Sequence, residues 1–164
     1  MSNTVRKVRL CFLSYANLSR MAMEVAAEFQ AVADIEFVDR AFDDAVVQAR
    51  EREQAKTVDA FVSAGSNAAL LKAALSAPVA TIKVTGYDIL VALRAARQLD
   101  QRVAIITYGD TIAELDAARA LLDIEIAQRA YRTLQDARIA SDELVAQGFQ
   151  VFIGSSIVVE QAEV

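Results

Sequence analysis

The chain has 164 residues, of which 55% are hydrophobic, and its formal net charge is -5. This length suits one domain or two small lobes, and the apolar fraction excludes a disordered chain. The negative charge argues against a surface that grips nucleic acid by itself, because such affinity comes largely from neutralising phosphates. The absence of histidine removes the commonest general base and metal ligand. A single cysteine can form neither an internal disulfide nor, alone, a zinc site.

The hydropathy pattern also bears on cellular location. No apolar run approaches the roughly 20 residues that a membrane-spanning helix needs. The N-terminal segment has no apolar stretch followed by a small-residue cleavage site, so no signal peptide is expected. We therefore expect a cytoplasmic protein without a membrane partner.

Short apolar runs alternate with amphipathic helical stretches along the whole chain. In chain order, the runs that predict strands are 8–14, 35–38, 59–63, 79–84, 102–107, 124–128 and 150–153. The stretches between them predict helices over 18–29, 45–55, 68–75, 87–99, 112–122 and a last one that ends near Gln147. Such alternation indicates an α/β fold with parallel sheets covered by helices.

Three local signals refine the helix ends. Thr111 and Glu114 have the spacing of a capping box, and Thr133 and Asp136 have a similar one. Gly148 is a suitable residue just beyond the C-terminus of the last predicted helix. In the first strand, Cys11 lies between two apolar residues and is interpreted as a core residue.

An internal repeat divides the chain. The segment 34–42 aligns without a gap to 123–131, an offset of 89 (123 − 34), and both share the pattern D-I-E-x-x-x-R-A-aromatic. Residues 13–15 align to 106–108 at an offset of 93, and residues 61–62 to 152–153 at an offset of 91. Near-constant offsets favour a duplicated unit over the ordinary similarity of βα units.

The repeat predicts two tandem Rossmann-like lobes. We expect a first lobe over 1–84, a connecting helix over 85–100 and a second lobe over 101–164. The counterpart of the strand at position 79 would begin near position 170 (79 + 91), so the second lobe is expected to be cut short before its last strand.

Candidate ligand-binding residues share one place in this fold. In open parallel sheets, ligands bind beyond the carboxyl ends of the strands, and two facing lobes would form a cleft there. The candidates are Ser14, Asn17, Ser63, Gly65, Ser66, Asn67, Lys83, Gly86, Tyr87, Tyr108, Arg129, Tyr131, Gly154 and Ser155.

Each candidate has an ordinary structural alternative. Gly65 and Ser66 could bring helix N–H groups to an oxyanion, or could form a plain turn with Ser66 as the N-cap. Lys83 could be a solvated surface lysine. Arg40 and Arg129 are repeat equivalents that could hold a carboxylate in bidentate fashion or pair with a neighbouring acid.

Several enzyme classes lack their signatures. No strand is followed by the dinucleotide fingerprint, and no phosphate-binding loop motif is present. The strand ends lack the acidic residues of a phosphoacceptor receiver, and one cysteine does not make a two-cysteine racemase. The polar strand ends therefore predict binding without turnover, with no catalytic residue, cofactor or metal.

Five strand-end segments carry a combined signal, of which the most specific is Ile82-Lys83-Val84-Thr85-Gly86-Tyr87-Asp88. The others are 63–67, 107–108, 128–131 and 136–138. Together these segments resemble the N-terminal receptor domain of propionate catabolism regulators, which are sigma-54-dependent transcriptional activators. The resemblance runs from about Val8 to Val164.

The resemblance implies a sensor. It implies two chelatase-like lobes that precede an AAA+ ATPase and a helix-turn-helix, and a small carboxylate ligand, 2-methylcitrate, whose binding relieves inhibition. Its implied partners are the protein's own AAA+ domain and sigma-54 RNA polymerase. The family motif G-[AD]-G-[LV] is replaced here by 154–157, which lack the second glycine. A stand-alone isomerase or lyase acting on a carboxylic acid and a purely structural dimerisation module, or another homo-oligomer, stay open as alternatives.

Overall fold

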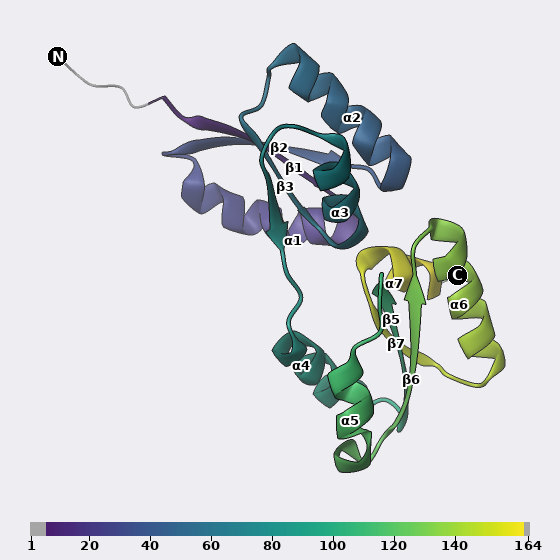
Figure 1. Ribbon diagram of the computed structural model, residues 1–164. Helices are drawn as coiled ribbons and strands as arrows, with labels where there is room; N and C mark the ends of the chain where they lie inside the picture. Colours follow the sequence, from purple (N-terminus) through teal and green to yellow (C-terminus); the bar gives the residue numbers. More distant parts are fainter. Residues whose placement is uncertain (1–5, 163–164) are drawn as a thin grey trace. The chain divides into compact units, whose positions relative to one another are not determined.

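The computed structural model describes residues 6–162, without the side chains of 117–120 and 160–162. Within them the chain forms two compact units, which we call unit 1 (Met1–Lys83) and unit 2 (Val84–Val164). Each unit is a parallel sheet with helices on its faces (Figure 1). The α/β fold with two tandem lobes that the sequence predicts is confirmed.

Unit 1 contains a four-stranded parallel sheet in the order β2-β1-β3-β4. Its elements are β1 (Val8–Ser14), α1 (Ala16–Ala26), a 3-10 turn (Ala27–Phe29), β2 (Ala33–Asp39), α2 (Phe42–Ala55), β3 (Ala60–Ala64), α3 (Gly65–Ala74) and β4 (Val79–Ile82). The central strand β1 pairs with β2 from Val8↔Ala33 to Ser14↔Asp39. The order therefore reverses between β1 and β3.

Alternate residues of β1 face opposite sides of the sheet, as its pleat requires. Cys11 and Leu13 belong to a buried cluster with residues of α2 and α3. Leu10 and Phe12 instead face α1, which covers the other side. The prediction that Cys11 is a core residue is confirmed, and burial raises the pKa of its thiol to about 12.

Unit 2 contains a three-stranded parallel sheet in the order β6-β5-β7. Its elements are α4 (Gly86–Ala96), β5 (Arg102–Tyr108), α5 (Ala113–Leu122), β6 (Glu125–Tyr131), α6 (Leu134–Ala146), β7 (Val151–Gly154) and α7 (Ser156–Ala162). This order repeats that of β2-β1-β3 in unit 1, as expected for a duplicated unit.

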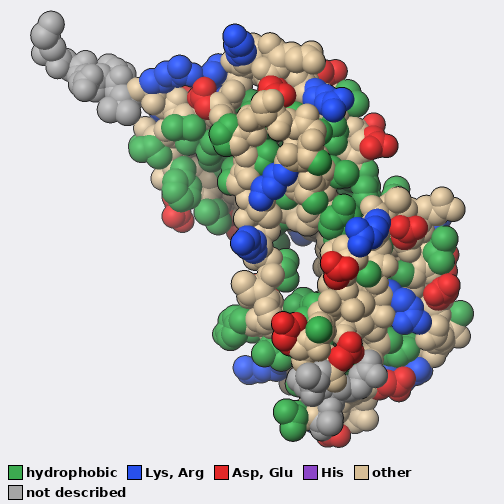
Figure 2. Space-filling view, in the orientation of Figure 1, with side chains coloured by type: hydrophobic (Ala, Val, Ile, Leu, Met, Phe, Trp, Pro, Cys, Tyr) green, Lys and Arg blue, Asp and Glu red, His purple; other side chains and the backbone are tan. Residues whose placement is uncertain are grey.

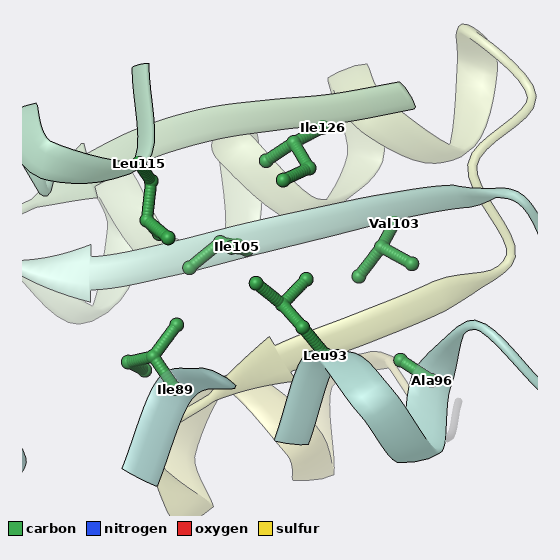
Figure 3. Packing of buried hydrophobic residues seen from close by; sticks show 7 residues of the cluster. All are labelled: Ile89, Leu93, Ala96, Val103, Ile105, Leu115 and Ile126. Carbon is green, nitrogen blue, oxygen red and sulfur yellow. The ribbon is translucent and has the colours of Figure 1, made fainter. Parts of the chain in front are cut away.

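The core of unit 2 joins α4 and α5 to one face of the sheet. Ile89 and Leu93 of α4 point toward Val103 and Ile105 of β5, and Leu115 of α5 completes the layer (Figure 3). All five side chains are almost fully buried. At about 1.5–3 kcal/mol for each fully buried large apolar side chain, this layer is a principal source of the unit's stability.

Of the two capping boxes predicted from the sequence, one is present in the structure and one is not. The capping box of Thr133 and Asp136 is confirmed at the start of α6. The one predicted at Thr111 is wrong, because α5 begins one residue later than that box requires, with Ile112 as its N-cap. The side chain of Gln128 holds both backbone groups of Ile112, accepting from its N–H at 3.0 Å and donating to its carbonyl at 3.1 Å. Two bonds from a neighbouring strand thus hold the residue before α5, although neither reaches the first-turn N–H groups that a cap would satisfy.

The last turn of α6 ends as predicted. Gly148 follows the C-cap with a φ of +88°, a left-handed conformation that glycine adopts readily. Its N–H donates to Val145, and the N–H of Phe149 donates to Leu144. The sequence pattern did not predict α7, which follows β7 directly.

Candidate functional site

The carboxyl edge of the sheet in unit 1 is the first candidate site. Parallel α/β sheets bind ligands where the strand order reverses, which here is between the ends of β1 and β3. Two helices begin at that point, α1 after β1 and α3 after β3. Neither of their N-cap residues, Tyr15 and Ala64, caps its helix with a side-chain hydrogen bond among the described residues. The first-turn N–H groups of both helices therefore lack such a cap.

Gly65 makes the abrupt turn from β3 into α3. Its φ is +52°, and a Cβ added there would meet nothing within 4 Å. Because glycine adopts this conformation at little cost, the helix can begin at once. The alternative in which Ser66 caps α3 is wrong, because Ser66 lies inside the helix and is buried.

Three polar candidates of unit 1 serve the fold itself. The hydroxyl of Ser14 lies 2.9 Å from that of Ser19, and the hydroxyl of Ser63 donates to the carbonyl of Leu13 at 2.5 Å. Asn67 accepts from the N–H of Phe42 at 2.9 Å and donates with its amide to the loop after β2. All three side chains are buried. Their role as ligand contacts stays a prediction, and their structural role is plain.

The side chain of Asn67 fixes the loop between β2 and α2. Phe42, the first residue of α2, has a φ of +52°, which is uncommon for a residue with a side chain. The bond from its N–H to Asn67, together with the bond from Asn67 to the carbonyl of Arg40 at 2.7 Å, holds this loop in place. The pattern of the sequence gave no signal for this strain.

Three other polar residues at the carboxyl edge of unit 1 are accessible to solvent. Asn17 is partly exposed, and its carbonyl oxygen accepts from Arg20 at 3.2 Å. Lys83 is exposed just beyond β4. Arg40, just beyond β2, is also exposed and donates to the carbonyl of Asp39 at 2.7 Å. A positively charged side chain thus lies directly beyond the end of each outer strand, β2 and β4.

The second candidate site is the carboxyl edge of unit 2, where the order reverses between β5 and β7. The hydroxyl of Tyr131, at the end of β6, lies 2.9 Å from that of Ser155, just after β7. The ring of Tyr108, at the end of β5, meets that of Tyr131 edge to face with centroids 5.6 Å apart. The structure therefore brings these three predicted residues together.

Gly154 and Arg129 complete this edge. A Cβ at Gly154 would lie 2.7 Å from atoms of Val158, so β7 and α7 approach too closely for a side chain. Arg129 donates to the carbonyl of Gln128 at 2.9 Å, and its Nε lies 3.9 Å from a carboxylate oxygen of Glu143. The guanidinium is thus partly engaged by the salt bridge that the sequence left open.

The last two candidates lie at the start of α4. Gly86 and Tyr87 are its first residues, and both are exposed. Thr85 and Asp88 form a capping box there, which the sequence interpretation missed although the spacing matches that of Thr133 and Asp136. The hydroxyl and backbone N–H of Thr85 hold the pKa of Asp88 below its ordinary value.

Two properties of the described residues bear on other functions. None of the described helices is long and apolar enough to cross a membrane. No group of three or more acidic or cysteine side chains in that part of the chain is placed to hold a metal ion.

One solved structure and one family model are similar to this chain. A crystal structure of an NtrC family transcriptional regulator from Clostridium acetobutylicum matches with a TM-score of 0.81 at 20% sequence identity. The match covers 96% of this chain and 82% of that chain, and it shows a shared fold. The family model described as propionate catabolism activator matches residues 29–164, which is most of the sequence. The chain therefore belongs to the propionate catabolism activator family.

Proposed function

We propose that this chain is a ligand-sensing regulatory domain that binds a small carboxylate and catalyses no reaction. The observation that carries the proposal is the pair of helix N-termini at the strand-order reversal of unit 1, neither capped by its own N-cap side chain. Backbone N–H groups at a helix N-terminus favour anions, both by hydrogen bonding and through the helix dipole.

The charges around the strand ends support an anionic ligand. Arg40 and Lys83 follow the outer strands of unit 1, and Arg129 lies near the end of β6 in unit 2. An acidic chain can still bind an anion when a few cations and N–H groups are concentrated locally. A tricarboxylate such as 2-methylcitrate, the leading candidate, would use several such groups at once.

The proposed mechanism is a shift of population. A ligand changes an equilibrium between two states only by its differential affinity for them. A carboxylate that engages residues of both units would supply this difference and so relieve the inhibition of an AAA+ module. That module and sigma-54 RNA polymerase are the proposed partners in the full protein.

Isothermal titration calorimetry with 2-methylcitrate, citrate and propionate tests the proposal. Saturable binding of 2-methylcitrate, weaker binding of citrate and none of propionate are expected. Lys83→Ala and Arg129→Ala should each weaken binding about tenfold or more, as expected for a lost charge-assisted contact. Lys72→Ala is the matched control, because this exposed lysine lies in the last turn of α3, far along the helix from the carboxyl edge.

Two results would overturn the proposal. Binding that is unchanged in both variants would remove these cations from the site. Sustained product formation from an organic acid would favour the enzyme alternative, although the one thiol of the chain is buried, with its pKa raised to about 12. Small-angle scattering should show a smaller radius of gyration with ligand if binding engages both units.

A further inference from the structure

The segment 40–42, between β2 and α2, holds a strained backbone. The φ of Phe42 is +52°, a left-handed conformation that is an outlier for a residue with a bulky side chain. Two hydrogen bonds to Asn67 keep it there, one from the N–H of Phe42 at 2.9 Å and one to the carbonyl of Arg40 at 2.7 Å. Strain of this kind persists only where the surrounding structure holds it, and it gathers at ligand clamps and switches.

The other copy of the internal repeat has the same motif in a relaxed conformation. Residues 40–42 align with 129–131 at the offset of 89, and both segments read Arg-Ala-aromatic. Tyr131, the counterpart of Phe42, is the last residue of β6 and is extended. Its carbonyl accepts from the N–H of Gly109 at 2.9 Å, which continues the ladder between β6 and β5. The motif itself therefore does not require the left-handed residue.

Asn67 accounts for the difference between the two copies. The offset of 91 equates Asn67 with Val158, and each is the third residue of the helix that follows the third strand of its unit. Val158 is fully buried, and its side chain has neither a donor nor an acceptor. It cannot hold the neighbouring loop as Asn67 does. The amide of Asn67 thus selects the strained state of a segment whose counterpart is extended.

We propose that segment 40–42 is a two-state switch, which Asn67 holds in the strained state and which a carboxylate bound by Arg40 releases into the extended state. The trigger rests on the proposed function. The guanidinium of Arg40 is exposed, and the carbonyl of the same residue is one end of the hold by Asn67. The ligand contact and the strained residue therefore lie within three consecutive residues.

Relief of strain gives the ligand its differential affinity for the extended state, which any shift of population requires. In that state the backbone of Arg40 is no longer tied to Asn67 and can follow the bound carboxylate. Figure 2 shows Lys, Arg, Asp and Glu side chains interspersed over the face in view, so local groups rather than a broad positive field select an anion there.

Two substitutions of Phe42 test the switch without ligand. Phe42→Gly and Phe42→Ala both remove the ring, but only glycine adopts the left-handed conformation at little cost. The glycine variant should melt about 4–8 °C higher than the alanine variant. In an Asn67→Val background, which copies unit 2, the order should reverse, because alanine suits an extended residue better than glycine. Thermal unfolding followed by circular dichroism measures all four proteins and shows that each is folded.

Nuclear magnetic resonance of the full chain tests the trigger. With 2-methylcitrate at a concentration that saturates binding in calorimetry, the Cα and Cβ shifts of Phe42 should move toward those of the Asn67→Val variant. Arg40→Ala should abolish this movement, and Arg50→Ala, an exposed arginine on α2, is the matched control. Phe42→Gly should bind 2-methylcitrate about tenfold more weakly than Phe42→Ala, because it has little strain to release.

Each part of the proposal has its own refutation. The same order of melting temperatures in both backgrounds overturns the switch. Unchanged shifts of Phe42 in a saturated complex overturn its release by the ligand. Failure of 2-methylcitrate to bind at all refutes the proposed function and this trigger together, while the order of the Phe42 variants still decides the switch.

Discussion

Gly154 offers a sharp test of the structure at the carboxyl edge of unit 2. A Cβ at this position would lie 2.7 Å from both Cβ and Cγ1 of Val158 and 3.1 Å from the carbonyl oxygen of Ile106. Val158 is fully buried, and a β-branched residue in a helix has essentially one side-chain rotamer. The valine cannot turn away, so α7 or the end of β7 must move.

Gly154→Ala should therefore destabilise unit 2 by about 1–3 kcal/mol, the usual range for overpacking a well-packed core. A domain of about this size loses roughly 4–8 °C of its melting temperature per kcal/mol. Thermal unfolding followed by circular dichroism measures the change.

Gly86→Ala provides the matched control, because it makes the same change in open space at the first residue of α4. It should be neutral or stabilise the unit by up to about 1 kcal/mol. Equal melting temperatures of the Gly154→Ala and Gly86→Ala variants would refute the close approach of β7 and α7.

Three further substitutions have defined outcomes. Asn67→Ala should destabilise unit 1 by about 2–4 kcal/mol in urea unfolding, because it removes two hydrogen bonds and leaves a backbone N–H without its partner. The hydrogen-bonded guanidinium of Arg9 holds the pKa of Asp59 well below its ordinary value. This pair therefore stabilises the fold above about pH 3.9, and its contribution is lost as the pH falls below that value. Asp59→Asn should lower the melting temperature at pH 7, with a difference from the parent that shrinks in acid. Tyr131→Phe should cost about 1 kcal/mol through the lost bond to Ser155, and a double-mutant cycle with Ser155→Ala should show coupling between them.

Most of the fold follows from local pattern. The strand at Val8–Ser14 matches its prediction at both ends, because its apolar run is bounded by polar residues. The periodicity that predicts a helix over 18–29 agrees with α1, whose Leu18, Met21 and Val25 line the same side of the helix. Periodicity does not tell how completely that face is covered, since this depends on a neighbouring helix that local sequence does not encode.

The sequence predicted where the candidate residues lie in the fold, but not what each of their side chains contacts. The strand ends do collect the predicted residues, since parallel strands end at one edge of a sheet. Ser63 and Asn67 look like ligand contacts in the sequence, yet the structure gives both of them partners within the fold. Those partners lie 50 and 27 residues away, so only the fold reveals them. The same holds for Gln128, whose two bonds to the backbone of Ile112 span 16 residues.

The connection between β4 and α4 has a mechanical consequence. The chain passes from unit 1 to unit 2 once, between Lys83 and Val84. Thr85, the next residue, is fastened to Asp88 by the capping box. Lys83 and Val84 are thus the only two residues between the end of β4 and the cap of α4, and the four soft torsions of their backbone set the path of the chain from one unit into the other.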